Sequence, residues 1–177
     1  VLFRSDFSIP DEIRDIFDFE PLRYLSSGML GDYIQQLSII QEKYYKTGRK
    51  GILYMTEKME VFRFGIQKTF EDTYKVISKQ SYIYSTKIHD GESFDIDLSE
   101  WRTIPYIHNT RSWWKTFKHF YDVEWASKPW LNEGVEIDDK WKGKTLVNTT
   151  RSRKFSISKE YIDEKNSIFI TNSDEDY

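Results

Sequence analysis

An acidic residue stands directly after a short, glycine-containing turn near the start of the chain. The turn is Ser26-Ser27-Gly28-Met29-Leu30-Gly31, and Asp32 follows it. Glycines let the backbone turn sharply with positive φ and let a ligand approach closely. A carboxylate here can accept a proton from a bound hydroxyl group within hydrogen-bond reach. It can also cap free N–H groups where a helix begins. Both roles remain open, and one side chain can serve both.

The flanking residues indicate a strand before this turn and a helix after it. Leu22 to Leu25 form a short apolar run, and residues 32–47 carry apolar side chains at helical spacing before Gly48, a residue typical of helix ends. Asp32 would therefore lie at the carboxyl end of a strand, which is where open α/β sheets bind their ligands.

Further segments continue the alternation of strands and helices. Residues 50–57 and 81–88 are predicted strands, residues 66–77 are a predicted amphipathic helix, and a short helix is expected over 11–17. This order predicts an α/β fold with a doubly wound, mostly parallel sheet and right-handed crossovers. The aromatic-rich segment 113–121 is expected to be a helix that contributes mostly to the core.

Two aspartates in a short alternating segment offer a possible cation site. Asp95 and Asp97 alternate with Phe94, Ile96 and Leu98, and a DxD pair can bind a divalent ion. The same alternation is typical of the solvated face of a half-buried edge strand, and we favour that interpretation. The chain has no cysteine and three histidines without close spacing, so we expect no metal site.

Composition changes along the chain suggest its organisation. We interpret residues 1–5 as the translation of a sequencing adapter, residues 6–125 as an N-terminal α/β domain, and residues 126–143 as a connector. Residues 144–177 would begin a second, truncated α/β domain, with strands at 144–150 and 167–172 and a helix at 158–165. We expect the sequence to continue beyond Tyr177.

Charge and hydropathy exclude several classes of partner. The net charge of −3 gives no bulk attraction to nucleic acid, and no apolar run approaches the roughly 20 residues of a membrane span. We therefore expect a soluble, cytoplasmic protein with no nucleic-acid partner. Aromatic residues make up 17% of the chain, which suits stacking against sugars and equally suits an ordinary core.

An ordered set of short motifs resembles a known family. The pattern GxxGDxxxxL over residues 28–37 is similar to the N-terminal motif of the ADP-heptose:lipopolysaccharide heptosyltransferases, which are two-domain glycosyltransferases of the GT-B fold. Four further motifs are similar to those of divergent phage, giant-virus-like or environmental members of this family. They are FDIDLSEWR at 94–102, PWL at 129–131, LVNTTRSRK at 146–154 and the final IFITNSDEDY. The resemblance implies a Rossmann-like N-terminal domain followed by the start of a donor-binding domain.

The resemblance also implies a reaction and a set of site residues. A sugar would pass from a nucleotide-diphosphate sugar to a hydroxyl of a glycan or lipid-linked glycan acceptor, with inversion and without a metal or other cofactor. Asp32 would be the general base. The expected acceptor-binding residues are Gly28, Gly31, Trp101 and Arg102, and the expected donor-binding residues are Asn148, Thr150, Arg151 and Arg153.

Other interpretations remain open. Arg151 and Arg153 suit the phosphate oxygens of a leaving diphosphate, and they equally suit a solvated basic turn. The chain could also be a non-catalytic nucleotide- or glycan-binding domain in which Asp32 only caps a helix. A small flavodoxin-like or Rossmann-like module is disfavoured because no GxGxxG follows a strand and no clear acidic ribose-binding residue occurs about 20 residues further on. We expect residues 1–177 alone to be inactive, since the cleft of such an enzyme needs both domains.

Overall fold

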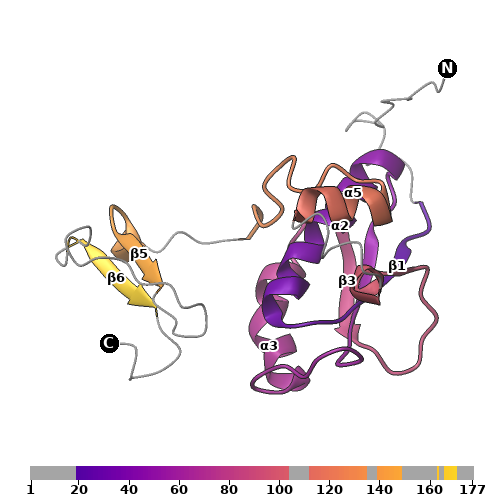
Figure 1. Ribbon diagram of the computed structural model, residues 1–177, viewed down its shortest axis with the longest axis horizontal. Coiled ribbons are helices and arrows are strands. Elements are labelled where there is room, and N and C mark those ends of the chain that lie inside the picture. Colours follow the sequence, from indigo (N-terminus) through magenta and orange to yellow (C-terminus); the bar gives the residue numbers. More distant parts are fainter. Residues whose placement is uncertain (1–18, 104–111, 135–138, 149–162, 164–165, 171–177) are drawn as a thin grey trace. The chain divides into compact units, whose positions relative to one another are not determined.

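The computed structural model describes residues 19–103, 112–134, 139–148, 163 and 166–170, which belong to two compact units that divide after Val135 (Figure 1). The elements of the first unit in chain order are β1 (Leu22–Ser26), α2 (Leu30–Thr47), β2 (Gly51–Met55), α3 (Ile66–Ile77), β3 (Ile83–Ile88), β4 (Ile96–Asp97), η1 (Glu100–Thr103) and α5 (Trp113–Tyr121).

A four-stranded parallel sheet forms the centre of the first unit. Its strand order is β3-β2-β1-β4, and every neighbouring pair runs parallel. The chain steps from β1 to β2 to β3 in one direction, and right-handed crossovers then place α2 and α3 on the same face of the sheet. It returns to add β4 on the other side of β1. The predicted α/β fold with a parallel sheet is confirmed, and its order is Rossmann-like.

The core joins this sheet to α2 and α3 and extends to η1 and α5. Tyr24 of β1 is in register with Leu53 of β2, and both side chains are fully buried. They pack in one cluster with Leu37 and Ile40 of α2 and with Ile77 of α3. Gly51, at the start of β2, leaves the space that the Ile40 side chain of α2 fills.

Helix α2 is covered on its outer side as well. Trp125 and Trp130 donate their indole N–H groups to the carbonyls of Gln35 and Ile34, at 3.2 and 2.8 Å. The segment 125–134, here called the strap, therefore follows α2 in its first part, residues 125–130. Further on, Asn132 and Glu133 hydrogen-bond to Gln80, which follows α3. The sequence predicts a connector over residues 126–143, whereas residues 126–134 belong to the first unit.

Polar side chains of α2 explain how the strap is held. Ser38 Oγ accepts a hydrogen bond from the backbone N–H of Ala126 at 2.9 Å, and Gln41 donates to the carbonyl of Pro129 at 2.9 Å. Glu42 accepts a hydrogen bond from the hydroxyl of Ser127. All three of these polar helix residues are buried.

The second unit contains a parallel pair of strands. β5 (Thr145–Asn148) pairs with β6 (Ser167–Ile170), with Val147 opposite Phe169, and a 3-10 turn η2 (Asp139–Trp141) precedes them. Both strands lie within the ranges predicted from sequence. The helix expected over 11–17 lies outside the described residues, as does most of the one expected over 158–165.

Within the described ranges, no helix combines the length and apolar character that crossing a membrane requires.

Substituting Gly51 tests the packing of α2 on the sheet. A Cβ atom there would lie 2.5 Å from Ile40 Cγ2 and 3.1 Å from the Tyr24 ring. We expect Gly51→Ala to lower the free energy of unfolding by about 1–3 kcal/mol because it overpacks this contact. Urea unfolding measures the change. In Ile40→Ala the obstructing methyl group is absent, so the double variant should lose less than the sum of the two single losses; simple additivity would contradict the contact.

Candidate functional site

The strand order identifies one edge of the sheet as the place where a ligand would bind. In open α/β sheets, ligands occupy the crevice outside the carboxyl ends of the strands, where the strand order reverses. Here the reversal falls between β1 and β4. β1 continues through Ser27 and Gly28 into α2, and β4 continues through Leu98 and Ser99 into η1. The residues that leave these two strands form the candidate site.

Asp32 lies in the first turn of α2, two residues beyond the start of the helix. The sequence predicts a helix that begins at Asp32, but the helix begins at Leu30, with Met29 as its N-cap residue. The Asp32 carboxylate reaches back so that Oδ2 accepts the backbone N–H of Met29 at 3.0 Å. The predicted capping role is therefore present, exerted from inside the helix.

The two glycines of the motif differ in what they do. Gly28 has φ +123°, and a Cβ atom there would lie 2.9 Å from both Cβ and Oδ2 of Asp32. Gly28 is thus required for the turn and for the position of the carboxylate. Gly31 is exposed, and a Cβ atom at this position would meet no atom within 4 Å. Its surface beside Asp32 is open to a ligand.

Arg102 joins the two sides of the reversal point. Its Nη2 forms an ion pair with Asp32 Oδ2, and its Nη1 donates to Glu60 Oε1 at 2.7 Å. Arg102 comes from η1 after β4, Asp32 from α2 after β1, and Glu60 from the loop between β2 and α3. Three elements therefore converge through one guanidinium, which also lies over the Trp101 ring at 5.0 Å.

The surroundings of Asp32 alter its acidity. Burial raises the pKa of the Asp32 carboxyl above its ordinary value, and the charge of Glu60 acts in the same direction. The Arg102 guanidinium and the Met29 N–H oppose this rise because they stabilise the ionised form. Both of these partners bind Oδ2, so Oδ1 makes no hydrogen bond with the described residues. Among the described residues, the carboxylate is therefore held through one oxygen alone.

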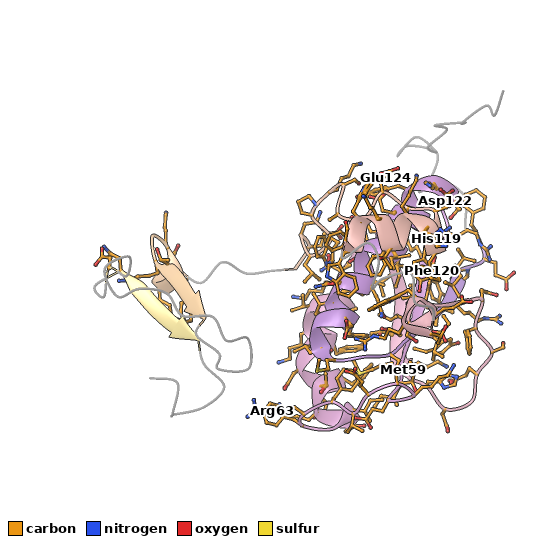
Figure 2. The ribbon with its side chains drawn as sticks, in the orientation of Figure 1. Met59, Arg63, His119, Phe120, Asp122 and Glu124 are labelled. Carbon is orange, nitrogen blue, oxygen red and sulfur yellow. The ribbon has the colours of Figure 1, made fainter. Side chains whose placement is uncertain are left out.

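Buried polar contacts hold the turn that carries this site. Ser27 Oγ accepts the backbone N–H of Met59 at 2.9 Å, and Gln36 donates to the carbonyl of Ser27 at 3.2 Å. The loop after β2 is thereby tied to the turn after β1. In Figure 2 the labelled Met59 lies in the lower part of the view, away from Asp122 and Glu124, which follow α5.

A second ion pair lies at the same edge of the sheet. Lys58, after β2, is 3.3 Å from Asp97 Oδ2 at the end of β4. Together with Asp32, Arg102 and Glu60 this makes more carboxylates than cations. Each of the two cations is already paired with a carboxylate. The cluster therefore suits a neutral, hydroxyl-bearing ligand better than a phosphate.

The aspartate pair of the DxD segment is engaged with the protein. Asp95 Oδ2 accepts the backbone N–H of Arg23 at 2.8 Å, and Asp97 Oδ1 accepts the backbone N–H of Ser99 at 2.8 Å. The edge-strand interpretation agrees with β4, which pairs with β1. Across the described ranges, no three His, Cys, Asp or Glu side chains gather as a metal site would require.

The structure brings some of the predicted site residues together. Gly28, Gly31, Asp32 and Arg102 lie at one site. Trp101 is 4% exposed and packs edge-on against Trp113 with ring centroids 4.8 Å apart, so its ring supports η1 from within the core. Asn148 ends β5 in the second unit, and the other predicted donor-binding residues, Thr150, Arg151 and Arg153, lie outside the described residues.

Sequence reasoning missed Glu60 and Lys58. Both belong to a charged loop, residues 56–65, in which no residue stands out by type or spacing. The signal that could have found them is the place of this loop in the fold. The loop follows β2, which lies next to β1 in a parallel sheet, so it begins at the same edge of the sheet as the turn that carries Asp32.

Comparisons with known proteins add no relative. No protein-family model matches the chain, and neither the curated proteins nor the solved structures give a significant match. The fold and the geometry at the reversal point are therefore the basis for inferring a function.

Substituting each glycine tests their different roles. We expect Gly28→Ala to lower the free energy of unfolding by about 1–3 kcal/mol, because a side chain is strained at that φ and meets the Asp32 carboxylate. Gly31→Ala should instead raise stability by roughly 0.5–1 kcal/mol through higher helix propensity. Denaturant unfolding of both variants measures the difference. A loss of stability in Gly31→Ala would show that Gly31, too, is required by the fold.

Proposed function

We propose that this chain is part of a glycosyltransferase that transfers a sugar from a nucleotide-diphosphate sugar to an acceptor hydroxyl, with Asp32 as general base. The observation that carries the proposal is the Asp32 carboxylate itself. It lies where the strand order reverses, its pKa is raised, and one of its oxygens is not hydrogen-bonded to the described residues. The motif resemblance over residues 28–37 supplies the reaction class.

The proposed step needs a proton acceptor beside the attacking oxygen. Asp32 Oδ1 takes the proton of the acceptor hydroxyl while the hydroxyl oxygen forms a bond to the anomeric carbon. The bond from that carbon to the diphosphate oxygen breaks, and the nucleoside diphosphate leaves with the electron pair. Attack from the opposite side inverts the anomeric centre. Asp32 then returns its proton to water. No atom changes its oxidation state in these steps, so no redox partner is needed.

The charge balance at the site supports an acceptor role for the first unit. Among the described residues, the cluster around Asp32 carries more carboxylates than cations, so it does not favour a diphosphate. A neutral hydroxyl group meets no such penalty, and the open surface at Gly31 leaves room for it. We therefore assign the acceptor to this edge and the nucleotide to the part of the protein that includes Asn148, Thr150, Arg151 and Arg153.

A binding module is the second candidate. Its support is that Asp32 already has two structural partners, the Met29 N–H and Arg102, which account for a buried carboxylate without chemistry. Such a protein would bind a glycan or nucleotide at the same edge and would release no nucleotide.

Substituting Asp32 distinguishes the glycosyltransferase from the binding module. The protein is expressed from its whole gene, including any residues before 1 and after 177, and nucleotide-sugar donors are screened for acceptor-dependent nucleotide release. We expect Asp32→Asn to lower kcat/KM by about 10²–10⁴-fold, because the amide can still accept the Met29 N–H but cannot take a proton. Undiminished turnover in this variant would remove Asp32 from the chemistry.

Asp95→Asn is the matched control. Asp95 also accepts a backbone N–H, from Arg23, but it precedes β4 and so lies away from the carboxyl ends of the strands. Its turnover should equal that of the wild type. If the wild type binds a glycan without releasing nucleotide from any donor, the binding module is the correct alternative.

A further inference from the structure

We propose that Glu60 is a positioning residue, which holds Arg102 against Asp32 and keeps the Asp32 carboxylate a better proton acceptor than a simple ion pair would allow. This role deepens the proposed function and rests on it for the use of the proton. Its central measurement, however, needs no transferase activity. Glu60 was not among the residues that the sequence singled out.

The geometry gives Arg102 two partners on opposite branches of its guanidinium. Nη1 donates to Glu60 Oε1 at 2.7 Å while Nη2 binds Asp32 Oδ2. The planar fork of a guanidinium fixes the angle between these two branches, so anchoring one of them orients the other. The same guanidinium lies over the ring of Trp101, which is buried. This contact limits the rotation of the guanidinium out of its plane. Glu60 thereby determines where the cation meets Asp32.

The charges around Asp32 give Glu60 a second effect. Among the described residues, three groups act on the carboxylate: the Arg102 guanidinium from η1, Glu60 from the loop after β2, and the Met29 N–H from the start of α2. An Arg102 cation paired with Asp32 alone would lower the pKa of that carboxyl strongly and weaken it as a base. Sharing the cation with Glu60 offsets this, since the two carboxylates together compete for one positive charge. The other ion pair at this edge, Lys58–Asp97, joins one cation to one carboxylate and so carries no net charge.

Two variants should move the proton affinity of Asp32 in opposite directions. Glu60→Gln keeps a hydrogen-bond acceptor for Arg102 but removes a negative charge, so the pKa of Asp32 should fall. Arg102→Gln removes the opposing cation, so the pKa should rise. The carbon-13 signal of the Asp32 carboxyl is followed by NMR during a pH titration of the labelled chain and assigned by its absence in Asp32→Asn.

The control is Glu57→Gln. Glu57 lies in the same loop, but its Oε1 accepts the backbone N–H of Phe62 at 2.9 Å, and it is not among the charges that shift Asp32. We expect no change in the Asp32 titration in this variant. An unchanged Asp32 pKa in Glu60→Gln, or shifts of the same sign in Glu60→Gln and Arg102→Gln, would overturn the role of Glu60.

Kinetics of the whole gene product separate this inference from the proposed function. In Glu60→Gln the acidic limb of the kcat/KM profile should move to lower pH, together with the NMR titration. If the NMR shifts occur as described but no donor gives transfer, the assignment of Glu60 stands and the glycosyltransferase proposal fails. If transfer occurs but its acidic limb does not move in Glu60→Gln, the effect assigned to the Glu60 charge is wrong.

Discussion

The position of α2 between the sheet and the strap is the constraint on which the candidate site depends. The helix packs into the core through Leu37 and Ile40, and on the neighbouring face it is hydrogen-bonded to the strap through Ser38 and Gln41. A helix held in both ways cannot shift along its axis without breaking both sets of contacts. Its first turn, and with it Asp32, is therefore fixed relative to the carboxyl ends of the strands.

This rigidity permits an arrangement of charge that would be unfavourable by itself. A largely buried carboxylate loses hydration, and a second carboxylate nearby adds repulsion. Arg102 compensates both costs because a guanidinium can serve two carboxylates at once. The side chains of Asp32 and Arg102 are only 11% and 19% exposed, so water screens their interaction weakly. The site thus combines a structural ion pair with a carboxyl group whose affinity for protons is raised.

The fold was largely accessible from sequence because each element carries a local signal. Residues 66–77 show the helical spacing of apolar residues that α3 has, and the glycine at 48 ends α2 as expected, with φ +71°. The strap was not accessible in this way. Its two tryptophans donate to backbone carbonyls of α2 that lie 90 and 96 positions earlier in the chain. Polar side chains of α2 bond to other groups of the strap over similar separations, and no local pattern records such pairings.

The sequence by itself determined the glycine turn, the acidic residue after it and the alternation of strands and helices, because these follow from backbone freedom and side-chain periodicity. Tertiary structure alone decided which charges meet Asp32. Arg102 is 70 residues away and reaches the carboxylate because β4 is added beside β1. Glu60 joins them because the loop after β2 ends at the same edge. The electrostatics of the site thus arise from strand order, a property of the whole sheet that no single segment carries.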